Sequence, residues 1–290
     1  MNELKSQSSD ISPYAPLKFP EFRNFIAGRF IYIMGIRMTG TVIGWWIYQL
    51  TNSKLALGLV GLSEVIPALS FALYAGHKID LSEKRKLLLL CVAFYSMCIL
   101  GLCYLSSEHA SSSMTPWAIA FLIFAIIGVT GLIRAFSGPT FSAMISQVVP
   151  RQMLANAAAI SSAGWLTASI VGHATGGFAI AFLGIHYTLF LVFALIIISY
   201  ILFARLKPKP AFITKAKNTW QSVKEGISYV FKTKELLGAL TLDLFAVLFG
   251  GAVALVPVFA MDILKISPIG FGWLNAAADI GSIITVTALT

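Results

Sequence analysis

The sequence alternates between long apolar runs and short polar breaks. A helix needs about 20 apolar residues to cross a bilayer. Only 11% of the 290 residues are charged and 58% are hydrophobic, whereas soluble domains carry about 25% charged residues. Because only internally hydrogen-bonded backbone is stable in lipid, the pattern predicts an all-α membrane protein, a helical bundle. Eight spans are predicted, at residues 24–50, 56–78, 87–105, 117–148, 154–183, 187–204, 236–261 and 269–290.

The basic residues give the chain an orientation. Outside the apolar runs, Lys and Arg gather in the tails and in alternate breaks, and only Lys54 and Lys265 lie in the opposite breaks. This asymmetry predicts a cytoplasmic N-terminus and explains the net charge of +9 without nucleic acid. The residues through Ser12 are polar and show no cleavable signal, so the first span is expected to stay in the mature protein.

Residues 206–235 form a basic interruption that divides the chain. Lys and Pro dominate to about Asn218, and apolar residues then recur at helical spacing, which predicts an amphipathic helix on the cytoplasmic surface or a solvated linker helix. The chain is thus divided into three segments: residues 1–205 with six spans, the linker at 206–235, and residues 236–290 with two spans. The apolar residues of the predicted linker helix are Trp220, Val223, Ile227, Val230 and Phe231.

The break between the second and third runs carries a motif. Gly76 is followed at spaced positions by Asp80, Lys84 and Arg85. Gly76 is expected to permit close backbone approach, and Asp80 to face the basic cluster that ends at Lys86. The motif resembles the loop between helices 2 and 3 of the major facilitator superfamily, although Leu81 stands where that family usually has Arg or Lys.

Two further stretches extend the resemblance. Arg134 and Gly138 are similar to the helix 4 motif of the superfamily, and the run from Val148 to Ala157 is typical of its exporter branch. Within that branch the chain looks most like the enterobactin-exporter and multidrug-efflux group. The helix 5 glycine pattern is partly kept, with His173 in place of a proline.

The resemblance implies a fold and a way of working. It implies a complete six-helix N-terminal half, the first two helices of a second half, and alternating access about a site near the midplane. Twelve helices are usual in that family, so the chain is expected to be a truncated product. Helix 11, the family's partner of the helix 2–3 loop, would then be missing, which puts the gating role of the loop in doubt.

Polar residues at membrane depth are the candidates for transport because each is unfavourable in lipid. Arg37, Thr41, Trp45 and Tyr48 share one face of the first helix, which would line a site for an amphiphile or anchor the helix at the interface. Glu64, about 14 Å into the second helix, is expected to pair with Arg37 and to take up a proton, or to form a static pair.

Four more charged or titratable residues lie in later spans. Arg134 could serve a proton relay, a substrate anion or Glu64. His173 is a coupling candidate or a packing histidine. Asp279 is the better substrate or coupling candidate of the second half, because Asp243 lies nearer the cytoplasm.

These residues favour a secondary transporter. The expected function is proton-coupled export of a small amphiphilic molecule, a drug or a siderophore, by an integral protein of the bacterial cytoplasmic membrane. The alternatives are a fragment or membrane interaction protein that transports nothing, and a lipid or lysolipid flippase of the same fold. No phosphate loop, catalytic constellation, cofactor motif or metal-ligand spacing is present in the sequence, and Cys91, Cys98 and Cys103 are expected to pack between helices.

Overall fold

The computed structural model describes residues 12–210, 224 and 228–289. Most of the predicted linker helix, including Trp220, Val223 and Ile227, lies outside these residues, and so does the side chain of Asp243. The described elements begin with η1 (Ala15–Lys18), α2 (Pro20–Thr51), α3 (Lys54–Leu81), α4 (Lys84–Leu105), α5 (Glu108–Ser113), α6 (Pro116–Val148) and η2 (Arg151–Met153). They continue with α7 (Leu154–Ala204), α9 (Lys234–Phe249), η3 (Gly250–Leu255), α10 (Val256–Val258), η4 (Phe259–Ile263) and α11 (Pro268–Leu289).

The first four predicted spans are confirmed as α2, α3, α4 and α6. Local signals set their ends. Pro20 and Pro116 begin α2 and α6, where the missing N–H of proline breaks no helical hydrogen bond. The side chains of Ser53 and Thr115 cap α3 and α6 by accepting from backbone N–H groups. The polar loop before α6 additionally contains the short helix α5, which the sequence analysis did not predict.

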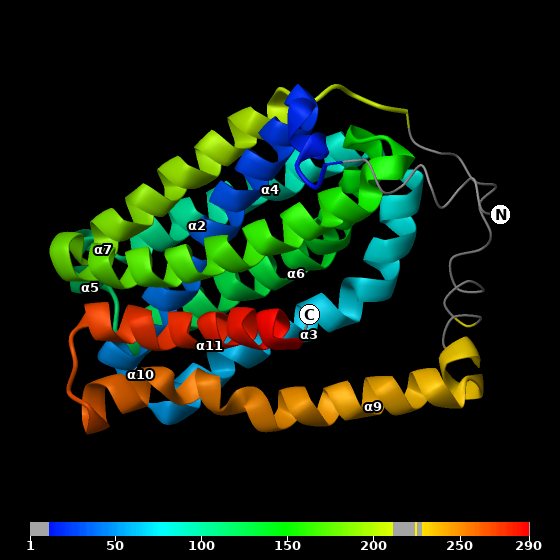
Figure 1. Ribbon diagram of the computed structural model, residues 1–290. Helices are drawn as coiled ribbons and strands as arrows, with labels where there is room; N and C mark the ends of the chain where they lie inside the picture. Colours follow the sequence, from blue (N-terminus) through cyan, green and yellow to red (C-terminus); the bar gives the residue numbers. More distant parts are fainter. Residues whose placement is uncertain (1–11, 211–223, 225–227, 290) are drawn as a thin grey trace.

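The fifth and sixth predicted spans are the two arms of α7. The helix is interrupted at Gly184, which has φ 75° and ψ 175°, a backbone conformation that side-chain-bearing residues rarely adopt. The hydroxyl of Thr188 donates to the Gly184 carbonyl and closes the first turn of the second arm. Because of this break the chain reverses, and the second arm runs back toward the end of the bundle where the first arm begins (Figure 1).

The prediction of one continuous seventh helix is wrong. The segment is divided into α9, the 3₁₀ helix η3, the short α10 and the π-helical η4. Gly250 and Gly251 at the end of α9 and Pro257 in α10 weaken a regular helix, because glycine lacks helix propensity and proline lacks an N–H. The eighth prediction is confirmed as a helix, α11.

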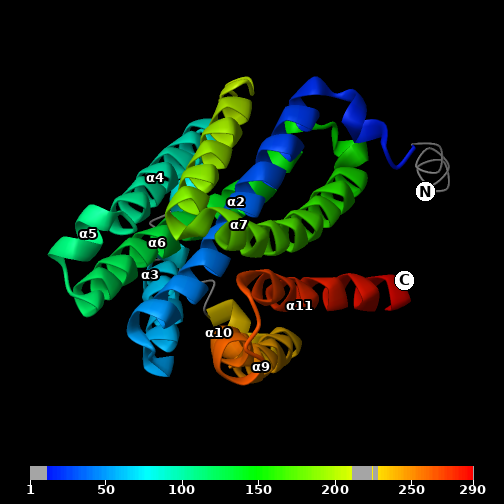
Figure 2. The same cartoon turned by 90° about the vertical axis from the view of Figure 1, so that its left-hand side faces the viewer.

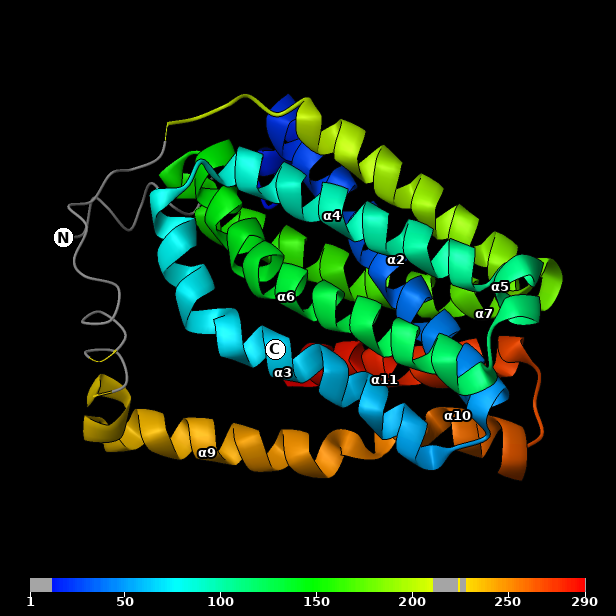
Figure 3. The ribbon, with the colours of Figure 1, turned by 180° about the vertical axis from the view of Figure 1, so that it is seen from behind.

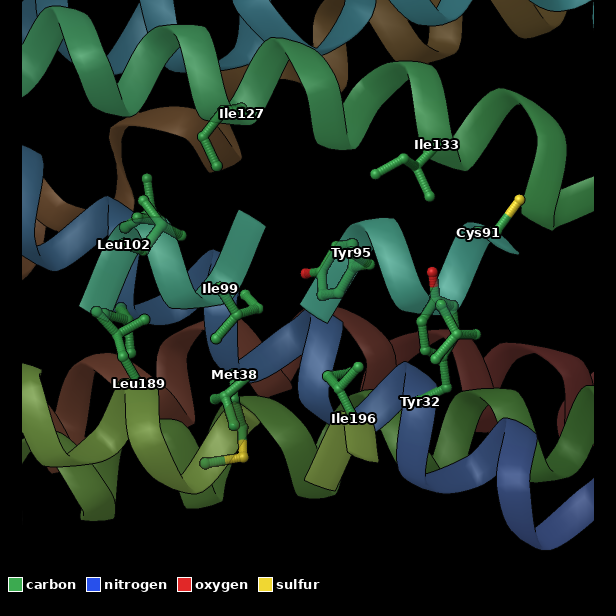
Figure 4. Packing of buried hydrophobic residues seen from close by; sticks show 14 of the residues in the cluster. Tyr32, Met38, Cys91, Tyr95, Ile99, Leu102, Ile127, Ile133, Leu189 and Ile196 are labelled. Carbon is green, nitrogen blue, oxygen red and sulfur yellow. The ribbon is translucent and has the colours of Figure 1, made fainter. Parts of the chain in front are cut away.

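The six spans up to Ala204 form a bundle around α2. Its core contains an aromatic cluster in which Tyr32 meets Tyr95 edge-on at 5.6 Å and Phe141 at 5.5 Å between ring centroids. Phe25 and Phe203 complete the cluster. Figure 4 shows Tyr32 and Tyr95 among apolar side chains contributed by several helices. Aromatic and branched side chains therefore hold these helices together.

The remaining helices lie on one side of this bundle. Figure 2 shows α9, α10 and α11 below α2 and α7. Two ends can be distinguished: the Tyr48 end, where α2 finishes, and the Pro20 end, where it begins. At the Tyr48 end α10 lies close to α2, whereas Figure 3 shows α9 running apart from the bundle toward the other end.

Within the described residues, five helical segments are long and apolar enough to cross a membrane: α2, α3, α4, α6 and the segment Arg151–Ala204, which holds both arms of α7. The apolar stretch of α3 is only 11% buried, and large side chains such as Leu69 and Tyr74 are exposed along it. Such a surface is stable against lipid and unfavourable in water. The chain is an integral, multi-pass membrane protein.

Candidate transport site

Glycines bring α2 and the first arm of α7 into close contact. A Cβ atom placed on Gly172 would lie 2.8 Å from the Cβ of Arg37, and one on Gly176 would lie 3.2 Å from the Cβ of Thr41. Such distances leave no room for a larger residue. These two glycines therefore let the helices pack closely, and they set Arg37 and Thr41 against α7.

A second glycine contact joins the first arm of α7 to α11. A Cβ on Gly177 would lie 2.8 Å from the Cα of Gly272. A Cβ on Gly272 would lie 2.7 Å from the backbone oxygen of His173. The backbone of the fifth span thus touches the backbone of the eighth, and the side chains beside these glycines are brought together across the contact.

Four polar side chains meet at this junction, and we call them the His173 cluster: Thr41, Ser169, His173 and Asp279. The Thr41 hydroxyl oxygen lies 2.8 Å from Nδ1 of His173 and 3.1 Å from the Arg37 carbonyl oxygen. Nε2 of His173 lies 3.9 Å from Oδ2 of Asp279, and the Ser169 hydroxyl donates to the same oxygen. The side chains of His173 and Asp279 are 13% and 15% exposed, so both are largely shielded from solvent.

The hydrogen bonds restrict the protonation of this cluster. The Thr41 hydroxyl has one proton, which serves either the Arg37 carbonyl or Nδ1 of His173. If Thr41 donates to the carbonyl, Nδ1–H donates to Thr41, and neutral His173 then carries a bare Nε2 toward Asp279. One proton added to Nε2 of His173 or to the Asp279 carboxylate changes the net charge of the contact between α7 and α11.

Glu64 and Arg134 form an ion pair between α3 and α6, with Arg134 Nη1 on Glu64 Oε1. The predicted pairing of Glu64 with Arg37 is wrong. Gly131, one turn before Arg134, lets the α6 backbone approach the α3 backbone at Glu64, and this brings Arg134 within reach. Both side chains border a cavity of about 70 Å³ that Thr39 and Thr130 also line. The Arg134 side chain is 45% exposed and the Glu64 side chain 30% exposed, so water can reach the pair.

The polar face of α2 contacts other helices instead of lining an open site. The guanidinium of Arg37 lies 5.1 Å from the centroid of the Trp165 ring on α7. The ring of Trp45 lies 5.5 Å from that of Phe271 on α11. The Tyr48 hydroxyl donates to Asp262 in η4. The face that the sequence analysis assigned to a substrate or to the interface therefore holds the first span against the fifth, seventh and eighth.

The loop motif acts through backbone groups. Nζ of Lys84 donates to the carbonyl oxygens of Ile79, Asp80 and Ser82, at 3.1 Å for the last two. Arg85 donates to the carbonyl of Ala204 at the end of α7, with 2.7 Å between the atoms. Asp80 thus contacts Lys84 of the basic cluster through its carbonyl oxygen, and the ion pairs of the described residues do not include its carboxylate.

Two motif glycines do not have close neighbours. A Cβ on Gly76 or on Gly138 would meet nothing within 4 Å. The expectation that Gly76 permits a close backbone approach is wrong for this structure.

Sequence reasoning missed Arg29, Trp165, Ser169 and Asp262. Ser169 lies one turn before His173, so its place on the same helix face was readable. Arg29 lies about two turns before Arg37, and a second Arg in an apolar run is a signal of its own. Trp165 and Asp262 are recognised only from their contacts, because their partners come from distant spans.

The family model described as "Transmembrane secretion effector" matches residues 11–290, nearly the whole chain. The chain belongs to this family of the major facilitator superfamily. It is 25% identical over 267 residues to "Uncharacterized MFS-type transporter YfmI" of Bacillus subtilis (strain 168), covering 87% of this chain and 62% of that protein. The chain thus spans less than two thirds of the length of this relative.

A solved structure shares the superfamily fold. It is the crystal structure of a bacterial homologue of the human lysosomal transporter Spinster, in an inward-facing and unoccupied conformation, with a TM-score of 0.63 and 17% sequence identity. The match covers 91% of this chain and 61% of that chain. The predicted superfamily fold is confirmed.

Proposed function

We propose that the chain works as a proton-coupled exporter of a small amphiphilic molecule by alternating access. The observation that carries the proposal is the contact between His173 and Asp279, 3.9 Å apart, which joins α7 of the first six spans to α11. In alternating access the two groups of helices must change their contact in every cycle. A titratable pair across that contact is suited to tie the change to a proton.

The proton would act by changing the relative stability of two conformations. With Asp279 charged, the Ser169 hydroxyl and a protonated His173 both favour the contact between α7 and α11. Protonation of Asp279 removes the charge attraction and weakens the hydrogen bond from Ser169. A ligand or proton shifts such an equilibrium only by as much as its affinity differs between the two states, and neutralising one member of a shielded pair supplies such a difference.

Glu64 and Arg134 provide a second coupling candidate within the first six spans. Protonation of Glu64 would release the Arg134 guanidinium into the adjoining cavity, where it could meet an anion or the dipole of a substrate. Because this pair is partly exposed, protons can reach it from water. We assign it the role of exchanging a proton with the transport pathway.

The orientation that fits this function has the Pro20 end in the cytoplasm of a bacterial cell. The excess of Lys and Arg in the breaks at that end supports it. The Tyr48 end would then face outward, and there Tyr48 and Asp262 join α2 to η4. In this orientation α9 runs toward the cytoplasmic end, apart from the bundle (Figure 3).

Transport by purified protein in lipid vesicles tests the proposal. A panel of labelled amphiphiles with anionic, neutral and cationic head groups is supplied, with and without a pH gradient, while a pH-sensitive dye reports proton movement. The proposal predicts movement of at least one amphiphile that is coupled to proton flux and lost in Glu64→Gln. Proton flux that is the same with and without every amphiphile of the panel would contradict it.

A further inference from the structure

Arg29 is a charged side chain at membrane depth whose guanidinium lacks a carboxylate partner. It follows Pro20 by nine residues, a rise of about 14 Å in a helix of about 48 Å. With a hydrocarbon core of about 30 Å centred on that helix, Arg29 lies about 5 Å inside the core boundary. Nη1 donates to the Ser161 hydroxyl, and the guanidinium carbon lies 5.5 Å from the Phe141 ring centroid. Nε is buried and has no hydrogen-bond partner within the described part of the chain.

The neighbouring helices cannot neutralise this charge. The first arm of α7 faces Arg29, and α7 contains no Asp or Glu from Leu154 to Ala204. The only acidic residue of α2 is Glu21, and its carboxylate accepts from the Lys207 N–H at 2.9 Å and from Lys209 Nζ at 3.0 Å. Among the ion pairs of the described residues, none includes Arg29. An unpaired cation is unfavourable at this depth, so pairing with an external anion would be favourable.

A pocket opens beside this guanidinium. Arg29, Ser162, Trp165 and Leu166 line a volume of about 320 Å³ between α2 and α7. That volume is within the range of small-molecule sites. Arg37, about 12 Å farther along α2, lies over the Trp165 ring and adds a second positive charge on that side. The lining thus combines one cation, a hydroxyl and an apolar wall, with Arg37 as a second cation nearby, and this composition suits an anionic head group attached to an apolar body.

We propose that this pocket binds the carboxylate or phosphate head group of an anionic amphiphile. The guanidinium of Arg29 pairs with the anion, the Ser162 hydroxyl donates to it, and Trp165 and Leu166 contact the apolar part next to the head group. The depth of the pocket, near the boundary of the hydrocarbon core, matches the level at which amphiphile head groups reside. If the bound amphiphile is also the exported molecule, the inference rests on the proposed function. The binding itself does not depend on that function.

Binding is measured on the detergent-free protein in phosphatidylcholine nanodiscs by calorimetry, with dodecyl phosphate as the probe. Dodecyltrimethylammonium has the same tail with a cationic head group, and inorganic phosphate has the head group without a tail. We expect dodecyl phosphate to bind, and the other two to bind at least about tenfold more weakly, because each lacks one of the two interactions. Equal affinity for the phosphate and the ammonium amphiphile would overturn the proposal.

Two variants locate the site, each with a matched control. Arg29→Gln should weaken dodecyl phosphate binding about tenfold or more, whereas Arg23→Gln, at an exposed position of the same helix, should leave it unchanged. Ser162→Asp should abolish binding by giving Arg29 an internal carboxylate, whereas the uncharged Ser162→Asn should not. Ser162 is exposed, so its substitution keeps the proposal testable if Arg29→Gln fails to fold. Unchanged binding in Ser162→Asp would assign the site elsewhere.

The origin of the natural ligand is separated by changing the lipid. If the pocket holds the head group of a membrane lipid, replacing part of the phosphatidylcholine by phosphatidylglycerol should weaken dodecyl phosphate binding in the wild type and not in Arg29→Gln. If it holds a soluble substrate, this exchange should have no effect and dodecyl phosphate should still bind. If Arg29→Gln does not weaken binding, the binding proposal fails while the proposal of proton coupling at Asp279 still stands. The two proposals can therefore be tested separately.

Discussion

Gly177 of α7 and Gly272 of α11 lie backbone against backbone. A Cβ on Gly177 would be 2.8 Å from the Cα of Gly272, and a Cβ on Gly272 would be 2.9 Å from the Cα of Gly177. Helices in lipid associate through such close packing because lipid supplies little hydrophobic driving force between them. This contact positions Asp279 near His173, one turn from Gly177, and so determines the geometry of the candidate coupling cluster.

A large residue at Gly177 should separate α7 from α11. Gly177→Leu is expected to lower the unfolding free energy by about 1–3 kcal/mol, the usual effect of overpacking, and to lower the melting temperature of the purified protein. Gly164→Leu is the control, because Gly164 lies on the same arm of α7 and a Cβ there would meet nothing within 4 Å. Equal melting temperatures for the two variants would show that the contact is not tight.

The spans were predictable because each depends on a local property of the sequence. Apolar runs of sufficient length, Pro20 and Pro116 at helix starts, and the polar breaks fix seven of the eight helices closely. The seventh was mispredicted because hydropathy does not register the Gly250–Gly251 pair or Pro257 as breaks. Turn chemistry at those residues outweighed the apolar pattern.

The pairing of charges was less predictable. Arg37 and Arg134 both lie at a depth that could reach Glu64, and depth along the chain does not say which helices are neighbours. Because α6 approaches α3 at Gly131, Glu64 pairs with Arg134. Similarly, His173 and Asp279 could be selected as candidates from the sequence because polar residues are unfavourable in lipid, while their proximity depends on the contact between distant spans.

Exchange of the charges at Glu64 and Arg134 tests whether they pair. Glu64→Arg and Arg134→Glu should each lower the melting temperature, because each places two like charges together. The double variant should recover much of the loss. The coupling energy is expected to be about 1 kcal/mol, because the pair is partly exposed and screened. Additive effects in the double variant would argue against a direct interaction.

Removal of the Tyr48 hydroxyl should loosen the Tyr48 end. Tyr48→Phe loses the hydrogen bond to Asp262 and leaves the ring in place. Spin labels at the exposed positions Leu55 and Leu264, in a cysteine-free background, would report a larger population of long distances in this variant. Tyr104→Phe is the control, because Tyr104 is exposed on α4. Identical distance distributions in Tyr48→Phe and the wild type would show that this bond does not hold the end closed.

Lys84 should stabilise the turn between α3 and α4. Lys84→Ala removes the donor that serves three carbonyl groups at the end of α3, and we expect a loss of about 1–3 kcal/mol in unfolding free energy. Lys86→Ala removes an exposed basic residue two positions later and should have little effect. Denaturant unfolding followed by circular dichroism measures both. A matching loss in Lys86→Ala would mean that net charge, not the bonds to carbonyl groups, stabilises the turn.

The central claim is that Asp279 couples transport to protons, and exchange experiments in vesicles test it most directly. The labelled amphiphile that gives the largest flux is followed in two modes: net movement driven by a pH gradient, and exchange against unlabelled amphiphile without a gradient. Ser282→Ala on α11 is the control, since its hydroxyl contacts only its own helix at Ala278. We predict that Asp279→Asn abolishes net movement and retains exchange. Net proton-driven movement at the wild-type rate in Asp279→Asn would contradict the account.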